Sequence, residues 1–97
     1  MKLRDITTVI EQVAPLSLAE EWDNPGIQIG RADSDVKQAL LCVDVTDDVL
    51  QEAVDTHCDL IISHHPLFFH PLKHLRFESA AERIAYRAVR EGISIYS

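Results

Sequence analysis

The sequence predicts an α/β domain with a mostly parallel sheet of βαβ units and helices packed on it. Two continuous apolar runs, residues 39–43 and 60–62, are typical of strands that are covered on both faces. A segment with helical spacing separates them, and a second helical segment leads to a third apolar run at residues 93–96. Because a strand–helix–strand crossover favours parallel pairing, the three runs are expected in one sheet.

The first element is a helix over about residues 4–14. Its apolar residues recur at steps of three and four and form one stripe. They are Leu3, Ile6, Val9, Ile10 and Val13. Pro15 ends the helix, because proline disfavours helical geometry at the residue before it. Ser17 and Glu20 have capping-box spacing, so a single short turn is expected to start there.

A loop and a short edge strand follow the first helix. The loop covers residues 22–26, and its Pro25 and Gly26 suit the two central positions of a type II turn. Residues 27–29 alternate between apolar and polar and end at Gly30, which is the pattern of a short edge strand.

The central βαβ unit has the clearest signals. Residues 39–43 form the first buried strand, and Thr46 or Asp47 can cap the helix that follows. Acidic residues at the start of this helix and His57 near its end both match the helix dipole. Residues 60–62 then form the second buried strand.

The last part of the chain begins with a loop rich in Pro, Phe and His, over about residues 63–77. Ser79 and Glu82 form a capping box for a helix that ends before Gly92. A third strand at residues 93–96 ends the chain, although termini usually lie at the surface. We therefore expect residues 1–97 to form a single incomplete α/β domain.

Composition excludes several classes of partner. The net charge is −7 at pH 7, and the sequence lacks the clustered Lys and Arg that a nucleic-acid partner requires. The longest apolar run, residues 39–43, is far shorter than the roughly 20 residues that span a bilayer. The first residues also lack the apolar core of a secretory signal. We expect a cytoplasmic protein without a nucleic-acid or membrane partner.

The spacing of the two cysteines and the absence of known catalytic motifs limit the kinds of site that the sequence can form. Cys42 and Cys58 have no C-x-x-C spacing and are expected to be reduced structural thiols. The sequence contains no phosphate-binding glycine motif and no nucleophile elbow. A phosphate-binding loop and a serine nucleophile of those types are therefore excluded.

His64 and His65 are the leading site candidates. They come directly after the strand at residues 60–62, and ligands in open α/β sheets bind at the carboxyl ends of the strands. On a regular strand the two side chains would point to opposite faces, but at a strand end they can reach two neighbouring ions about 3.5–4 Å apart. Imidazole suits Zn, Fe, Ni or Cu, and carboxylate ligands add Mn. The alternative is that the pair is only part of a loop.

Asp44 is a second candidate, at the end of the preceding strand. It emerges at the same edge of the sheet as His64 and could accept a hydrogen bond from an imidazole. Its other role, which we favour from the sequence, is to cap the next helix together with Thr46 and Asp47.

The remaining candidates have weaker signals. We expect His57, His70 and His74 more often as solvated loop or helix-end residues than as metal ligands. Lys73 could bind an anionic substrate, although a single Lys is usually only a surface residue. The neighbouring aromatic residues, Phe68 and Phe69, are expected in the core, because they bury a large apolar area.

Three segments together carry a family resemblance. They are WDNPGI at residues 22–27, LCVDVT at 41–46 and DLIISHHPL at 59–67. In order and spacing the chain resembles the N-terminal part of the Nif-three-like dinuclear metal-centre family, often labelled GTP cyclohydrolase I type 2. Pro25 departs from many relatives, which carry an apolar residue such as Val there, and should only stiffen a turn.

The resemblance implies a dinuclear metal site. It implies two divalent ions per full-length subunit, Zn, Fe, Mn or Ni, with His64 and His65 as the first two ligands. In the family an aspartate just beyond a Tyr-Ser like Tyr96-Ser97 and a later His and Glu complete the centre. The resemblance thus implies that residues 1–97 are the N-terminal part of a larger metal-binding protein and hold an incomplete site.

Two readings of function follow from the resemblance. The first is a metal-dependent hydrolase, GTP cyclohydrolase-like, that acts on a small molecule or nucleotide and has no assigned catalytic residue in this chain. The alternative is a non-catalytic metal-binding scaffold or regulatory oligomeric protein. In both readings the family implies self-association, as a homohexamer of the full-length parent.

Overall fold

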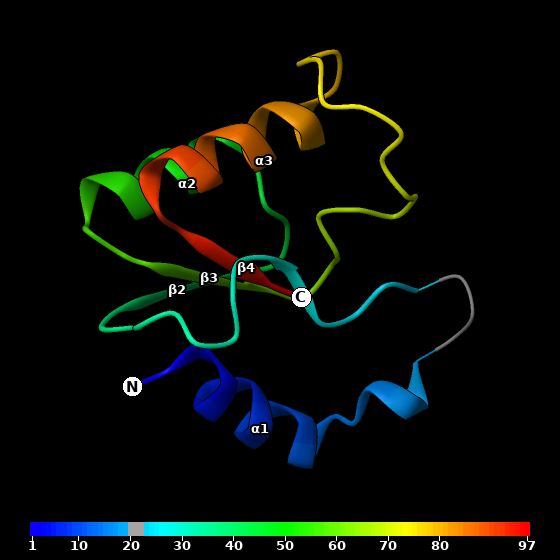
Figure 1. Cartoon of the computed structure of the whole chain (residues 1–97), viewed down its shortest axis with the longest axis vertical. Coiled ribbons are helices and arrows are strands. Elements are labelled where there is room, and N and C mark those ends of the chain that lie inside the picture. Colours follow the sequence, from blue (N-terminus) through cyan, green and yellow to red (C-terminus); the bar gives the residue numbers. More distant parts are fainter. Residues whose placement is uncertain (20–22) are drawn as a thin grey trace.

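A mixed four-stranded sheet forms the centre of the described part of the chain, residues 1–19 and 23–97 of a computed structural model (Figure 1). The strands are β1 (Ile27–Ile29), β2 (Ala39–Cys42), β3 (Leu60–Ser63) and β4 (Ser94–Tyr96), and their order is β1-β4-β3-β2. β2, β3 and β4 are parallel, and β1 is an antiparallel edge strand beside β4. The predicted mostly parallel α/β sheet is confirmed.

Helices lie on both faces of the sheet. α2 (Asp47–Asp55) and α3 (Ala80–Glu91) cover one face, and α1 (Leu3–Val13) packs on the other (Figure 1). A short 3₁₀ turn, η1 (Leu16–Leu18), follows α1. No helix among the described residues has both the length and the apolar character needed to cross a membrane.

Each face of the sheet has its own core. The larger core lies under α2 and α3 and contains Leu50, Ala53, Ile61, Ile84, Ala88 and Ile95. The smaller core lies under α1 and contains Leu3, Val36, Leu60 and Tyr96. Alternate residues of the central strand β3 therefore enter different cores, as the two-residue period of a strand requires.

Both helices of the larger layer begin where the sequence predicts. Thr46, rather than Asp47, caps α2, and its Oγ1 accepts a hydrogen bond from Val49 N at 3.1 Å. Ser79 caps α3, and its Oγ accepts from Glu82 N at 3.2 Å. α3 ends at Gly92, whose φ of 70° is the left-handed conformation that glycine adopts most easily.

The expectation that β2 is covered on both faces is wrong. The strand order places β2 at an edge of the sheet, and its Leu41 is 73% exposed. α1 packs against Leu60 and Tyr96 of the neighbouring strands and leaves this part of the face open. A continuous apolar run therefore predicted the strand correctly but not its position in the sheet.

The segment before β1 differs in detail from the prediction. The residue that precedes η1 is Pro15 and not Ser17, and Glu20 and Trp22 of the predicted capping box and loop lie outside the described residues. Gly26 has a φ of 117°, as the predicted turn requires at that position. Its backbone exchanges two hydrogen bonds with Ser97, so the pairing of β1 with β4 extends to these residues.

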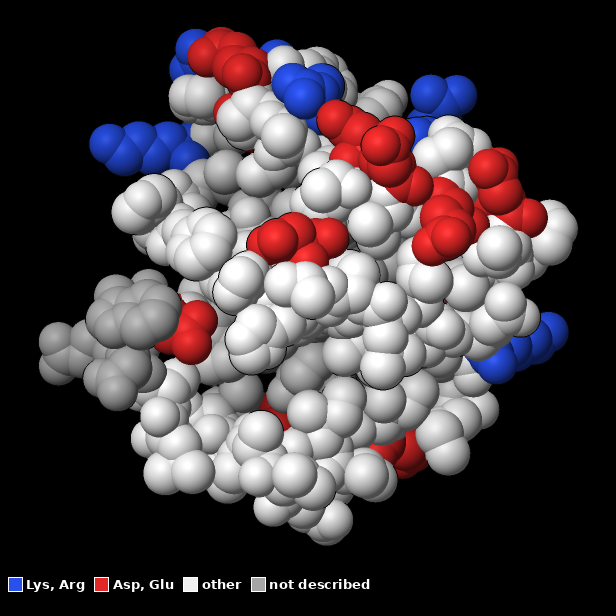
Figure 2. Space-filling view, turned by 180° about the vertical axis from the view of Figure 1, so that it is seen from behind, with Lys and Arg blue, Asp and Glu red and all other residues white. Residues whose placement is uncertain are grey.

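Charge is unevenly distributed over the surface. On the face in Figure 2, Asp and Glu side chains gather toward the end of the molecule that α2 and α3 occupy, and Lys and Arg are scattered at its margins. The rest of this face is mostly uncharged, with a few separate Asp and Glu side chains.

Candidate metal centre

His64 and His65 lie at the carboxyl end of β3. The parallel pairing of β2 and β3 continues past both strands, because His64 N donates to Cys42 O at 3.1 Å and His65 N donates to Val43 O at 2.9 Å. The backbone of the histidine pair is therefore fixed to the neighbouring strand, while both side chains are exposed.

The two imidazole rings lie close together. Their centroids are 4.9 Å apart and their planes are tilted by 49°. Neighbouring side chains on a regular strand would point to opposite faces, and the end of the strand relaxes this constraint. The two rings therefore lie side by side at the end of β3.

Asp44 orients one of the two rings. Its Oδ1 lies 2.7 Å from His65 Nδ1. An ionised carboxylate can only accept, so Nδ1 carries a proton, and in the neutral ring Nε2 is then the nitrogen with the lone pair. The role that we favoured from the sequence, capping α2, is wrong, because Thr46 takes it. A carboxylate that fixes the tautomer of an imidazole is a common partner of metal-binding histidines.

Ser63 is a functional candidate that the sequence analysis missed. Its buried hydroxyl donates to His65 O at 2.7 Å, and it lies 2.7 Å from Ser97 Oγ. Because the Ser63 proton is used on the carbonyl, Ser97 donates the second bond. These contacts join the ends of β3 and β4 below the histidine pair. The signal in the sequence is a polar residue that ends an otherwise apolar strand.

Both cysteines are free thiols. Burial raises the pKa of the Cys42 thiol, and the negative charge of Asp44 raises it further. Cys42 is therefore protonated near neutral pH, which makes it a poor metal ligand. Cys58 is buried in the larger core. The prediction of structural thiols agrees with both positions.

The weaker candidates lie on other segments. His57 follows α2 with a φ of 58° and is exposed, and His74 Nδ1 lies 3.6 Å from Glu82 Oε2. His70 and Lys73 are exposed on the loop before α3. Among residues 1–19 and 23–97, no three His, Cys, Asp or Glu side chains form a group that could hold a metal ion.

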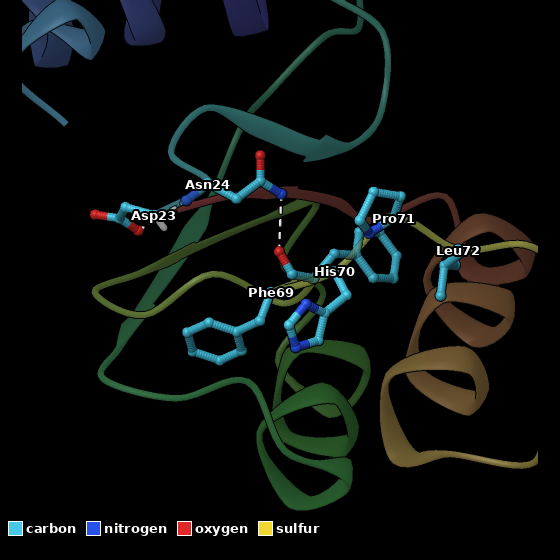
Figure 3. Close-up of a pocket in the computed structure, with 7 residues that line it drawn as sticks. Asp23, Asn24, Phe69, His70, Pro71 and Leu72 are labelled. Atoms are coloured by element: carbon cyan, nitrogen blue, oxygen red, sulfur yellow. Dashed lines mark hydrogen bonds between the residues drawn. The ribbon is translucent and has the colours of Figure 1, made fainter. Parts of the chain in front are cut away.

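A pocket of about 680 Å³ lies between Asp23–Asn24 and residues 68–72 (Figure 3). Asn24 Nδ2 donates to Phe68 O at 2.8 Å and so joins the two segments that line the pocket. Phe68 is half-buried against the larger core, as predicted, but Phe69 is 54% exposed, so its predicted core position is wrong. Phe68 and Phe69 are adjacent in an extended loop, so when Phe68 faces the core Phe69 faces outward.

Comparison with known proteins identifies the family. The family described as Duf34/NIF3 (NGG1p interacting factor 3) matches residues 1–97. The chain belongs to this family. Among Duf34/NIF3 relatives, a Clostridium acetobutylicum protein named "GTP cyclohydrolase 1 type 2 homolog" is 31% identical over 97 residues, which are 100% of this chain and 36% of the relative. The rat "NIF3-like protein 1" is 36% identical over 98 residues, covering 100% of this chain and 26% of the relative.

The fold agrees with that of a solved structure. The crystal structure of Staphylococcus aureus protein SA1388 matches with a TM-score of 0.94 at 34% identity, over 100% of this chain and 28% of that chain. The family resemblance predicted from the sequence is confirmed. The chain spans between 26% and 36% of the length of these relatives and of the solved structure.

Proposed function

We propose that the full-length protein is a metal-dependent hydrolase that binds a pair of divalent ions through His64 and His65. The observation that supports this most is the adjacent pair of exposed imidazoles at a strand end, one of them held in a defined tautomer by Asp44. Ligands are expected at this edge of a parallel sheet.

The donor set fits half of such a centre. Each imidazole offers one nitrogen to a different ion, and Zn, Fe, Mn or Ni are all compatible with imidazole and carboxylate ligands. Catalytic zinc sites typically use three protein ligands and keep one position open. The described residues contain no group of three potential ligands, and we propose that the rest of the full-length protein supplies the remaining ones.

The residues of this chain have distinct roles in the proposed reaction. A bound pair of divalent ions supplies a water of lowered pKa as a nucleophile near neutral pH. Asp44 keeps the Nε2 lone pair of His65 available, and Ser63 and Ser97 hold the backbone beneath it. GTP or a related nucleotide is the proposed substrate class, because curated relatives are named GTP cyclohydrolase 1 type 2 homologs. We place the protein in the cytoplasm, as a homohexamer.

Elemental analysis of the full-length protein tests the metal centre. Wild-type protein is expected to hold two ions per subunit, and the His64→Ala/His65→Ala double variant is expected to lose them. His57→Asn is the matched control, because this exposed histidine follows α2 and Asn tolerates its left-handed backbone. Full metal occupancy in the double variant would contradict the assignment.

Turnover separates the hydrolase from a metal-binding scaffold. We expect hydrolysis of GTP that stops when a chelator removes the metal, resumes when the metal returns, and is absent in the double histidine variant. Stoichiometric metal without turnover of any nucleotide would support the scaffold instead.

A further inference from the structure

The pocket beside the histidine pair has one rigid wall. Gln28 Oε1 accepts from Phe68 N at 3.1 Å, Gln28 Nε2 donates to Asn24 O at 2.8 Å, and Asn24 Nδ2 donates to Phe68 O at 2.8 Å. Two of these bonds join segments that are 40 and 44 residues apart in the chain, and the bond between Gln28 and Asn24 braces one of the segments internally. The pocket is therefore preformed, as small-molecule sites usually are.

The opposite wall is aromatic and open. Figure 3 shows the Phe69 and His70 rings on one side of the pocket, with Asp23 and Asn24 on the other. Phe69 is 54% exposed, which leaves much of an apolar ring without protein cover. Exposed aromatic faces are the platforms on which planar bases stack.

Asp23 supplies the hydrogen-bonding edge. Its Oδ1 accepts from Asn24 N at 2.8 Å, which orients the carboxylate and leaves further lone pairs on both oxygens. A carboxylate with both oxygens available matches two neighbouring N–H donors, as on the edge of a guanine ring. Adenine lacks this pair of donors.

The pocket lies at the same edge of the sheet as the histidine pair. Asn24 precedes Gly26, whose backbone pairs with Ser97 at the end of β4, and Ser97 bonds Ser63 at the end of β3. Residues 68–72 follow His65 directly along the chain. A ligand in the pocket would therefore lie beside the candidate metal centre.

We infer that this pocket binds a planar nitrogen heterocycle of the guanine type, stacked on Phe69 with its N–H edge on Asp23. The volume of about 680 Å³ is within the range of small-molecule sites. The inference rests on the proposed function in that the ring would be part of the substrate, whereas binding of the ring alone needs no metal.

Calorimetric titration of the full-length protein with guanosine tests the pocket. The experiment is done with metal-loaded and chelator-treated protein, and 1-methylguanosine, in which a methyl group blocks one donor, serves as the matched ligand. Guanosine is expected to bind saturably in both preparations and more tightly than 1-methylguanosine. Phe69→Leu is expected to weaken guanosine binding about tenfold through lost stacking. Asp23→Asn is expected to remove the preference for guanosine over its methylated form.

Phe77→Leu is the control, because Phe77 is similarly exposed, at 49%, and packs on Tyr86 instead. Equal guanosine affinity in Phe69→Leu and Phe77→Leu, or no saturable binding by wild-type protein, would overturn the inference. Loss of guanosine binding only in His64→Ala/His65→Ala would also overturn it. If the wild-type protein binds guanosine but takes up no divalent metal ion when metal is supplied, the proposed metal centre is rejected and the pocket is kept.

Discussion

Two histidine–carboxylate pairs among residues 1–19 and 23–97 differ in their surroundings. His65 Nδ1 and Asp44 Oδ1 are 2.7 Å apart, and their side chains are 49% and 63% exposed. His74 Nδ1 and Glu82 Oε2 are 3.6 Å apart, and the Glu82 side chain is only 8% exposed. The pair with the shorter distance is the one that lies open to water.

The difference lies in the other partners of each carboxylate. Glu82 also accepts from Arg76 N at 2.6 Å and from Ser79 Oγ at 3.1 Å, so it ties the loop before α3 to the start of that helix. Asp44 accepts a side-chain bond from His65. A buried carboxylate with backbone donors stabilises the fold, whereas an exposed ion pair contributes little to stability. Orientation of the imidazole is therefore the role that remains for Asp44.

The largest expected effect separates these two roles. Asp44→Ala should lower metal affinity about 10–100-fold, the usual cost of removing a carboxylate that orients a metal-binding histidine. The melting temperature of the metal-free Asp44→Ala variant should hardly change, since Asp44 and His65 are both exposed. Competition with a chromophoric chelator measures the affinity, and Asp48→Ala, an exposed acidic residue of α2, is the control. Unchanged metal affinity in Asp44→Ala would remove the contrast between the pairs.

Glu82→Gln is expected to have the opposite profile. The amide has one acceptor oxygen in place of two, so the bonds from Arg76 N and Ser79 Oγ cannot both be kept. We expect the melting temperature to fall by about 5 °C, a moderate loss for a chain of this size, with unchanged metal affinity. Differential scanning calorimetry and the chelator assay measure the two quantities. A stable variant with weakened metal binding would reverse the assignment of the pairs.

Acid is expected to lower the stability of the fold by protonating Glu82. The Arg76 N–H lowers the pKa of Glu82 below its ordinary value, burial opposes this, and Ser79 and His74 add to the lowering. The folded pKa lies below the unfolded one, so this stability is fully present above about pH 4.5 and is lost as pH falls through the folded pKa. Urea unfolding midpoints between pH 7 and pH 3 should drop less steeply for Glu82→Gln than for wild-type protein. Parallel curves would contradict this origin.

Sequence patterns predicted the helices and strands better than they predicted which side chains are buried. Caps at Thr46 and Ser79 depend on contacts three residues along the chain, so spacing alone locates them. The exposure of Leu41 depends instead on the strand order, and that of Phe69 on the path of a loop. Neither order nor path leaves a periodic signal.

The candidate site shows the same limit. His64 and His65 were predictable, because they follow an apolar strand directly. A hydrogen bond from an imidazole was one of two roles expected for Asp44, and capping was favoured because His65 is 21 residues away and the helix begins nearby. A local pattern cannot decide between a near and a distant hydrogen-bond partner when both are chemically suitable.

The smallest expected effect is that of Thr46→Ala, which tests whether Thr46 or Asp44 caps α2. Thr46→Ala removes the side-chain acceptor for Val49 N and should destabilise the fold by about 1 kcal/mol, as measured by urea unfolding. Metal affinity should stay unchanged, since Asp44 keeps its bond to His65. Thr46→Ser, which retains the hydroxyl, should restore most of the stability. If Thr46→Ala instead weakened metal binding and left stability intact, Asp44 would have left His65 and moved to the N-terminus of α2 in place of the lost hydroxyl.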